Sequence, residues 1–140
     1  MEAADQSLMN AAPLVLVIED SPVVQHLLRA TLTPMGVGLL FAGDGETGLE
    51  LARAHVPEVI TLDIGLPGIN GWGVLAEVRS APATAGIGVI VLTAHVQKSM
   101  EIAAVEGGAD GFITKPFRPQ DLRAEVGGLL DRRSVFAPIS

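Results

Sequence analysis

The sequence predicts a doubly wound α/β domain built on a five-stranded parallel sheet. Short apolar runs rich in β-branched residues recur along the chain, and the segments between them carry apolar residues at helical spacing. Glycine and proline mark most of the joins. Strands of a parallel sheet appear as continuous apolar runs because helices cover both of its faces. We expect the strand order 2-1-3-4-5, which is common in doubly wound sheets.

The first strand and helix have clear boundaries in the sequence. The apolar run 14–18 follows Pro13 and precedes two acids, which predicts a buried strand. Ser21 and Pro22 then predict a helix start, with Ser21 as the N-cap and Pro22 at the first helical position. The apolar face of this helix is expected to carry Val24, Leu27, Leu28 and Thr31.

The later elements follow in the same alternation. Further strands are expected at 37–42, 59–62, 87–92 and 111–114. Further helices are expected after Gly43–Gly45, from about Trp72, around 98–106 and from Pro119. Two adjacent glycines, Gly127 and Gly128, are expected to interrupt the last helix, each at about 1 kcal/mol relative to alanine.

Composition narrows the function classes. The chain has 140 residues and a net charge of −7, which disfavours direct binding to nucleic acid or to an anionic membrane. Cysteine is absent, so thiol chemistry, disulfides and zinc-thiolate sites are excluded. No apolar run is long enough to span a bilayer, and the N-terminus lacks the basic start of a secretory signal. We therefore expect a cytoplasmic protein without membrane insertion.

We expect one domain with short extensions. Residues 1–12 are polar and aperiodic and are predicted to form a flexible leader. Residues 13–133 contain all the predicted strands and helices, and 134–140 form a C-terminal tail.

Polar side chains stand at the ends of four of the predicted strands. The carboxyl ends of parallel strands meet at one edge of the sheet, where doubly wound folds bind their ligands. These residues are Glu19, Asp20, Asp63, Thr93 and Lys115.

This group predicts phosphoryl chemistry. The three carboxylates would repel one another unless a cation joins them, and an all-oxygen set of acids suits Mg²⁺ (or Mn²⁺). Lys115 offers a compact positive charge and Thr93 a hydroxyl to phosphate oxygens. Because phosphoryl transfer depends mostly on positioning and charge neutralisation, this short set of groups suffices.

The same residues carry a resemblance to the response regulator receiver domain over about residues 13–133. The motifs that carry it are Glu19-Asp20-Ser21-Pro22, Asp63 with Pro67 and Gly71, Thr93-Ala94, and Lys115-Pro116-Phe117. The resemblance implies a flavodoxin-like (βα)5 fold and a switch in two-component signalling or a phosphorelay.

The resemblance also implies roles at the site. Asp63 would accept phosphate from a histidine kinase or a phosphotransfer protein, forming an aspartyl phosphate. Asp20 and Asp63 would bind the metal directly with the backbone carbonyl of Gly65, and Glu19 would help through water. Lys115 would pair with the phosphoryl group. Such a protein is no enzyme beyond catalysing its own phosphorylation and slow dephosphorylation.

Other roles concern switching and lifetime. Thr93 would hydrogen-bond the phosphoryl group, and Phe112 matches the aromatic position that turns inward as Thr93 moves. The surface of the helix 98–106, the strand 111–114 and the last helix would then change for an unknown output protein. The chain would act as a monomer or as a phosphorylation-dependent dimer. Gly65 and His95 stand at positions that tune phosphate lifetime, and the Lys115–Pro116 bond is expected to be cis.

Three alternatives remain. One is a receiver-like interaction module that works without phosphorylation. Another is dinucleotide binding by Gly43, Gly45 and Gly48, but this glycine fingerprint belongs after the first strand of a dinucleotide fold and here follows the second. The last is a phosphatase of the haloacid dehalogenase type, which needs a second acid where this chain has Gly65.

Overall fold

The computed structural model describes residues 12–94 and 98–136, and these form a single five-stranded sheet covered by helices. All strand pairs are parallel and the order is β2-β1-β3-β4-β5. The predicted fold class and strand order are therefore confirmed. The strands are β1 (Leu14–Ile18), β2 (Gly38–Ala42), β3 (Val59–Asp63), β4 (Gly88–Thr93) and β5 (Gly111–Thr114).

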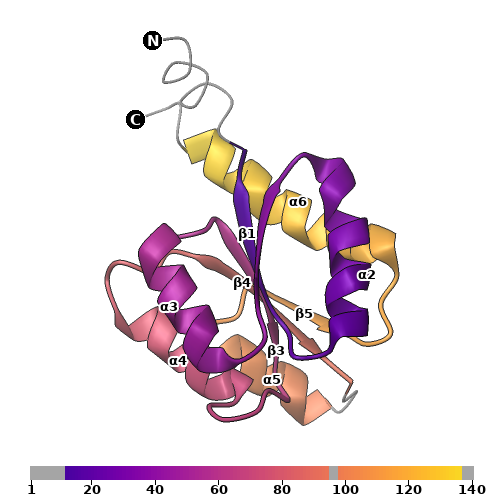
Figure 1. Cartoon of the computed structure of the whole chain (residues 1–140). Helices are drawn as coiled ribbons and strands as arrows, with labels where there is room; N and C mark the ends of the chain where they lie inside the picture. The colour runs from indigo at the N-terminus through magenta and orange to yellow at the C-terminus, as the bar shows by residue number, and fades with distance from the viewer. Residues whose placement is uncertain (1–11, 95–97, 137–140) are drawn as a thin grey trace.

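The helices cover both faces of the sheet (Figure 1). They are α2 (Pro22–Leu32), α3 (Gly45–His55), α4 (Gly71–Ser80), α5 (Lys98–Glu106) and α6 (Pro119–Phe136), with a short 3₁₀ turn at Thr33–Met35. Helices α2 and α6 lie on one face, and α3, α4 and α5 lie on the other. No helix in the described part of the chain is long and apolar enough to cross a membrane.

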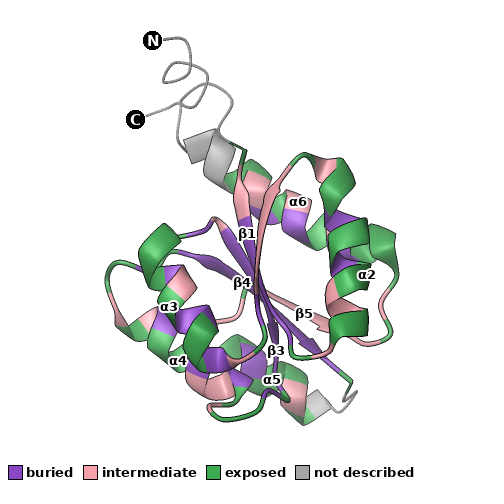
Figure 2. Ribbon diagram, viewed as in Figure 1, coloured by how far each residue is buried: buried purple, intermediate pink, exposed green. Residues whose placement is uncertain are grey.

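Alternation along the strands divides the core into two layers. Leu16 and Ile18 of β1 pack with the residues of α3 and α4, while Val15 and Val17 pack with those of α2 and α6. Figure 2 shows the buried strands running between the two helical layers. Because both faces are covered, β1, β3 and β4 are apolar almost throughout, as the sequence pattern indicates.

The boundaries of some elements differ from the prediction. Asp63 is the last residue of β3 and Thr93 is the last residue of β4, so both belong to strands rather than to the loops that follow. The expected interruption at Gly127 and Gly128 is wrong, because α6 runs without a break to Phe136. Burial of neighbouring Val126 and Leu129 against the sheet outweighs the low helix propensity of the glycine pair.

One residue assigned to an apolar helix face is in fact exposed. Leu27 of α2 is 43% exposed, whereas Leu28, Thr31 and Leu32 are buried. The contact stripe of α2 runs through Val24, Leu28, Thr31 and Leu32, so Leu27 lies beside it.

The glycine fingerprint at the start of α3 has a packing role. A Cβ at Gly45 would lie 2.5 Å from Ile69, and one at Gly48 would lie 2.5 Å from Ile18, so both positions admit close contact between α3 and its neighbours. The carboxylate of Asp44 accepts the Thr47 N–H at 2.7 Å and caps the helix. That capping bond lowers the pKa of Asp44. The helix start is thus already capped by an acid, which disfavours a pyrophosphate there.

Candidate functional site

Asp63 is the last residue of the central strand, and the loop after it folds back tightly. Its Oδ1 accepts the N–H of Gly65 at 3.1 Å, and its side chain is 11% exposed. The Gly71 N–H donates to the carbonyl of Ile64 at 3.0 Å, which brings the start of α4 against the strand end. A Cβ at Gly71 would lie 2.6 Å from the Asp63 carbonyl oxygen, so this return requires glycine.

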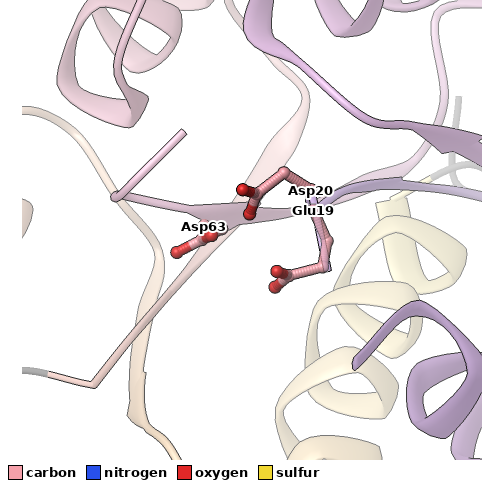
Figure 3. Close-up of side chains that lie close together, drawn as sticks. All are labelled: Glu19, Asp20 and Asp63. Carbon is pink, nitrogen blue, oxygen red and sulfur yellow. The ribbon is translucent and has the colours of Figure 1, made fainter. Parts of the chain in front are cut away.

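Three carboxylates gather at this strand end. Glu19, Asp20 and Asp63 each offer an oxygen, and these oxygens all lie within 4.8 Å of one another (Figure 3). Glu19 and Asp63 are buried, whereas Asp20 is exposed. Register explains the meeting, because Ile18 at the end of β1 pairs with Leu62, which precedes Asp63 in β3. The set contains hard oxygen donors and an exposed side, and it therefore fits a cation such as Mg²⁺ that retains waters.

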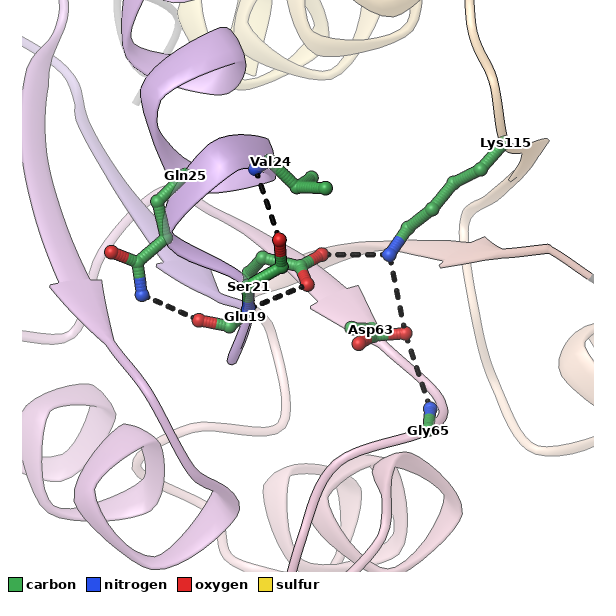
Figure 4. Close-up of polar contacts among 7 residues, drawn as sticks. All are labelled: Glu19, Ser21, Val24, Gln25, Asp63, Gly65 and Lys115. Atoms are coloured by element: carbon green, nitrogen blue, oxygen red, sulfur yellow. Dashed lines mark hydrogen bonds and ion pairs between the residues drawn. The ribbon is translucent and has the colours of Figure 1, made fainter.

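Lys115 joins this cluster from the end of β5 (Figure 4). Its Nζ lies 2.8 Å from Glu19 Oε1 and 3.5 Å from Asp63 Oδ1. One cation thus bridges two of the three carboxylates. The resemblance implies that Lys115 pairs with a phosphoryl group. In this structure its Nζ forms an ion pair with Glu19.

Glu19 is fixed in place by several contacts. Its Oε2 accepts the Ser21 N–H at 3.2 Å, and its backbone carbonyl accepts the Gln25 side chain at 2.5 Å. Burial raises the pKa of Glu19; the hydrogen bond from Lys115 opposes this rise, and the nearby charge of Asp63 adds to it. A bound cation would oppose the same rise by favouring the carboxylate form.

Thr93 and Phe112 lie on the same side of the sheet. Val91 pairs with Phe112 and Thr93 pairs with Thr114 across β4 and β5, and paired residues of parallel strands point to the same face. Phe112 is half-buried and packs on the core layer beneath α3, α4 and α5. Thr93 is buried, and its carbonyl accepts the Lys115 N–H at 2.7 Å. The backbone therefore connects Thr93 directly to Lys115.

The structure brings most of the sequence-predicted site residues to one edge. Glu19, Asp20, Asp63 and Lys115 lie together, and Thr93 ends the strand beside Asp63. The peptide bond between Lys115 and Pro116 is cis. His95 lies outside the described residues.

Sequence reasoning missed the part played by Gln25. Gln25 lies one helical turn after the N-cap Ser21, and a polar side chain at that position can reach back to the end of the preceding strand. Its position in the sequence could therefore have indicated this contact. Its contact with the Glu19 carbonyl ties α2 to the acid cluster.

Comparison with known proteins agrees with the family resemblance of the sequence. The family model of the response regulator receiver domain matches residues 15–127. The transcriptional regulatory protein KdpE of Mycobacterium tuberculosis is 36% identical over 129 residues, which cover 90% of this chain and 54% of that protein. The chain therefore spans about half the length of the curated relatives it matches.

Solved structures share the fold. The receiver domain of the Francisella response regulator 1452 is 27% identical with a TM-score of 0.81, over 86% of this chain and 98% of that one. The receiver domain of the Pseudomonas aeruginosa sensor histidine kinase PA1611, which has a magnesium ion coordinated in its active site cleft, is 23% identical with a TM-score of 0.79. That match covers 86% of this chain and 98% of the other, and at this identity it shows the fold alone.

Proposed function

The chain belongs to the response regulator receiver domain family, and on that premise we propose that it is a phosphorylation-dependent switch whose phosphoacceptor is Asp63. The observation that carries this proposal is the position of Lys115 Nζ between Glu19 and Asp63 at the carboxyl end of the sheet. Phosphoryl transfer depends on positioning and on positive charge beside the transferred group, and Lys115 provides such a charge beside the Asp63 carboxylate. The proposed domain comprises residues 13–133.

The proposed transfer starts from a phosphohistidine of a histidine kinase or a phosphotransfer protein. A carboxylate oxygen of Asp63 attacks phosphorus, forming an O–P bond while the N–P bond of the donor breaks. The electron pair of that bond returns to the imidazole ring of the donor. Lys115 exchanges part of its contact with Glu19 for a phosphoryl oxygen, and Thr93 donates its hydroxyl to another.

Metal binding is part of the proposal. Asp20 and Asp63 would hold Mg²⁺ (or Mn²⁺) with the Gly65 carbonyl, and Glu19 would bind through water. The bound ion supplies positive charge that stabilises the phosphoryl oxygens. The fit of the acid cluster to a hard cation supports this within the chain itself. The magnesium of the PA1611 receiver domain lies in a cleft of the same fold.

Phosphate would shift the chain between two conformers. In one of them Thr93 moves toward the phosphoryl group and Phe112 turns further inward, because both lie on one face of the sheet. The surface of α5, β5 and α6 would then change for an output partner. The size of this population shift is limited by how much better phosphate is bound in one conformer than in the other. Gly65 offers no acid or base to activate water, so dephosphorylation would be slow.

Other properties follow as proposals. Signalling would take place in the cytoplasm, without direct contact with nucleic acid or insertion into a membrane. The chain would act as a monomer or as a phosphorylation-dependent dimer.

The test is phosphorylation with a small donor. Acetyl phosphate and Mg²⁺ should add one phosphoryl group to the intact protein by mass spectrometry, and the Asp63→Ala variant should remain unmodified. Absence of the adduct would favour an interaction module that works without phosphorylation, and its persistence in Asp63→Ala would reject Asp63 as the phosphoacceptor.

A further inference from the structure

The side chain of Gln25 reaches from α2 back to the carboxyl end of β1. Its amide Nε2 donates to the Glu19 carbonyl at 2.5 Å, and its backbone N–H donates to the Ser21 carbonyl at 2.9 Å. Figure 4 shows the half-buried amide beside the segment that follows β1. One residue of the helix therefore contacts the backbone both before and after Asp20, a proposed metal ligand.

The Glu19 carbonyl lies just beyond the end of the paired strands. The last pair of β1 and β2 in register is Ile18 with Ala42, and the Glu19 N–H still donates to the Ala42 carbonyl at 2.9 Å. The carbonyl of Glu19 instead accepts a hydrogen bond from a side chain, that of Gln25. Because Glu19 is buried, this carbonyl needs a partner within the protein. The Gln25 amide thus takes the place of a strand partner at this point.

The hydrogen bond to this carbonyl influences the direction of the Asp20 side chain. The Glu19 carbonyl and the Asp20 N–H belong to one planar peptide unit, so fixing the carbonyl also fixes the N–Cα bond of Asp20. The hydrogen bond to the Ser21 carbonyl holds the chain on the other side of Asp20. Because the backbone is held on both sides, the Cα–Cβ bond of Asp20 has a defined direction.

Asp20 depends on this support more than the other two acids do. The carboxylates of Glu19 and Asp63 both contact Lys115, at 2.8 and 3.5 Å. The Asp20 carboxylate is exposed and makes no hydrogen bond or ion pair with the residues that the structure describes. It nevertheless offers an oxygen within 4.8 Å of those of the other two acids. Its place in the cluster is therefore set by the backbone.

Helix α2 does not need the Gln25 amide for its own start. The Oγ of Ser21 accepts the Val24 N–H at 3.3 Å and caps the helix, and Pro22 occupies its first position. Apolar residues such as Leu28 pack the helix on the core. Capping and packing of α2 are thus provided by other residues, and the amide contact serves the strand end.

We propose that Gln25 is a positioning residue of the metal site: its amide holds the Glu19–Asp20 peptide so that the Asp20 carboxylate faces that of Asp63. The inference rests on the proposed function for the identity of the ion, Mg²⁺. Outer groups that orient metal ligands typically contribute about ten- to a hundredfold to metal affinity. Because the amide is neutral, Gln25 acts through geometry and not through charge.

The test is the affinity of the full chain for Mg²⁺, measured by isothermal titration calorimetry without a phosphate donor. Gln25→Met keeps a long side chain but has no donor, and we expect it to lower the Mg²⁺ affinity by about tenfold. His26→Met, at the next and exposed residue of α2, is the matched control and should bind Mg²⁺ like the wild type. Thermal unfolding without metal shows whether each variant is folded.

Gln25→Glu separates geometry from charge, and it also decides the inference if Gln25→Met does not fold. At mildly alkaline pH the new carboxylate has the shape of the amide but cannot donate, and it repels the Glu19 carbonyl. Its negative charge alone would attract the cation and raise the Mg²⁺ affinity. We expect the affinity to fall instead, whereas His26→Glu, with the same charge one residue away, should not lower it.

The Mg²⁺ dependence of phosphorylation gives a second readout. With acetyl phosphate, Gln25→Met should need about tenfold more Mg²⁺ to reach half of its maximal rate, and the maximal rate should fall much less. An unchanged Mg²⁺ affinity in Gln25→Met, a higher affinity in Gln25→Glu, or a loss confined to the maximal rate would overturn the inference. If the wild type binds Mg²⁺ but gains no phosphoryl group, the proposed function fails, while the calorimetry still decides the role of Gln25.

Discussion

Arg79 and Asp110 form an ion pair, with Nη2 and Oδ2 2.9 Å apart, that joins the end of α4 to the loop before β5. The same guanidinium donates to the carbonyls of Ala85, Ile87 and Gly108 at 2.9, 2.6 and 2.9 Å. Asp110 also accepts the Val89 N–H at 2.9 Å. The Arg79 side chain thus links the segments that precede β4 and β5, at the edge of the sheet opposite the acid cluster.

Loss of this network should be costly. Replacing Arg79 with alanine removes a donor from three carbonyls and one of the two partners of Asp110, and we expect the free energy of unfolding to fall by about 3 kcal/mol. Arg53→Ala is the matched control, because its ion pair with Glu77 is about half exposed and should contribute about 1 kcal/mol or less. Urea denaturation of both variants measures the difference. Equal effects would show that the network contributes no more than a surface pair.

Thr61 should be replaceable with a gain in stability. Its hydroxyl is buried in β3 and has no hydrogen-bond partner among the described residues. Thr61→Val keeps the shape and removes an unpaired polar group, so we expect an increase of about 1 kcal/mol in the free energy of unfolding. Thr84→Val is the control: that hydroxyl donates to the Val78 carbonyl at 2.8 Å, and its loss should destabilise. If Thr61→Val also destabilised the chain, the hydroxyl would have a partner.

Val56 is held in a conformation that costs energy. It follows α3 with φ +43°, in the left-handed region that a β-branched side chain rarely adopts. Asparagine tolerates that region, so Val56→Asn should raise the free energy of unfolding by about 1 kcal/mol. Thermal unfolding compares it with Val23→Asn, at an exposed valine within α2, which should give no gain. A gain in both would mean that the stabilisation comes from exchanging an exposed apolar side chain for a polar one, and not from the relief of backbone strain.

The acceptor loop should tolerate a methyl group at one glycine and reject it at another. Among the described residues, a Cβ at Gly65 would have Asp63 Oδ1 as its one neighbour within 4 Å, whereas a Cβ at Gly71 would lie 2.6 Å from backbone atoms of Asp63 and Ile64. Gly65→Ala should therefore fold and accept phosphate like the wild type. Gly71→Ala should lose about 2 kcal/mol of stability through overpacking and accept phosphate more slowly. Unfolding and intact mass of both variants give the comparison, and an equal response would mean that the loop is not constrained at Gly71.

The sequence determined most of this fold because its strands are buried on both faces and therefore appear as uninterrupted apolar runs. The meeting of Glu19, Asp20, Asp63 and Lys115 could also be predicted, since each one ends or follows a strand and parallel strands end at one edge. What the sequence did not reveal depends on packing between distant elements. The exposure of Leu27 depends on how α2 rotates against the sheet. The continuity of α6 through its glycine pair depends on the burial of Val126 and Leu129.

The contacts around Lys115 are a second example. Its strand-end position was visible in the sequence, but its 2.8 Å contact with Glu19 depends on the separation of β1 and β5 across the sheet. The contacts of Arg79 were equally hidden, because nothing local distinguishes it from a surface arginine.

Glu19 should increase the affinity for Mg²⁺, because its carboxylate lies beside those of Asp20 and Asp63. The side chain is 2% exposed and is held by Lys115 and the Ser21 N–H beside the oxygens of Asp20 and Asp63. Glu19→Gln keeps the shape but removes a negative charge, so we expect Mg²⁺ affinity to fall by about tenfold or more. The fluorescence of Trp72, the single tryptophan, reports binding from the start of α4. Glu50→Gln, an exposed acid on α3, is the control and should titrate like the wild type. If Glu19→Gln also titrated like the wild type, while Asp20→Asn lost binding, the buried acid would serve to hold Lys115 rather than the metal.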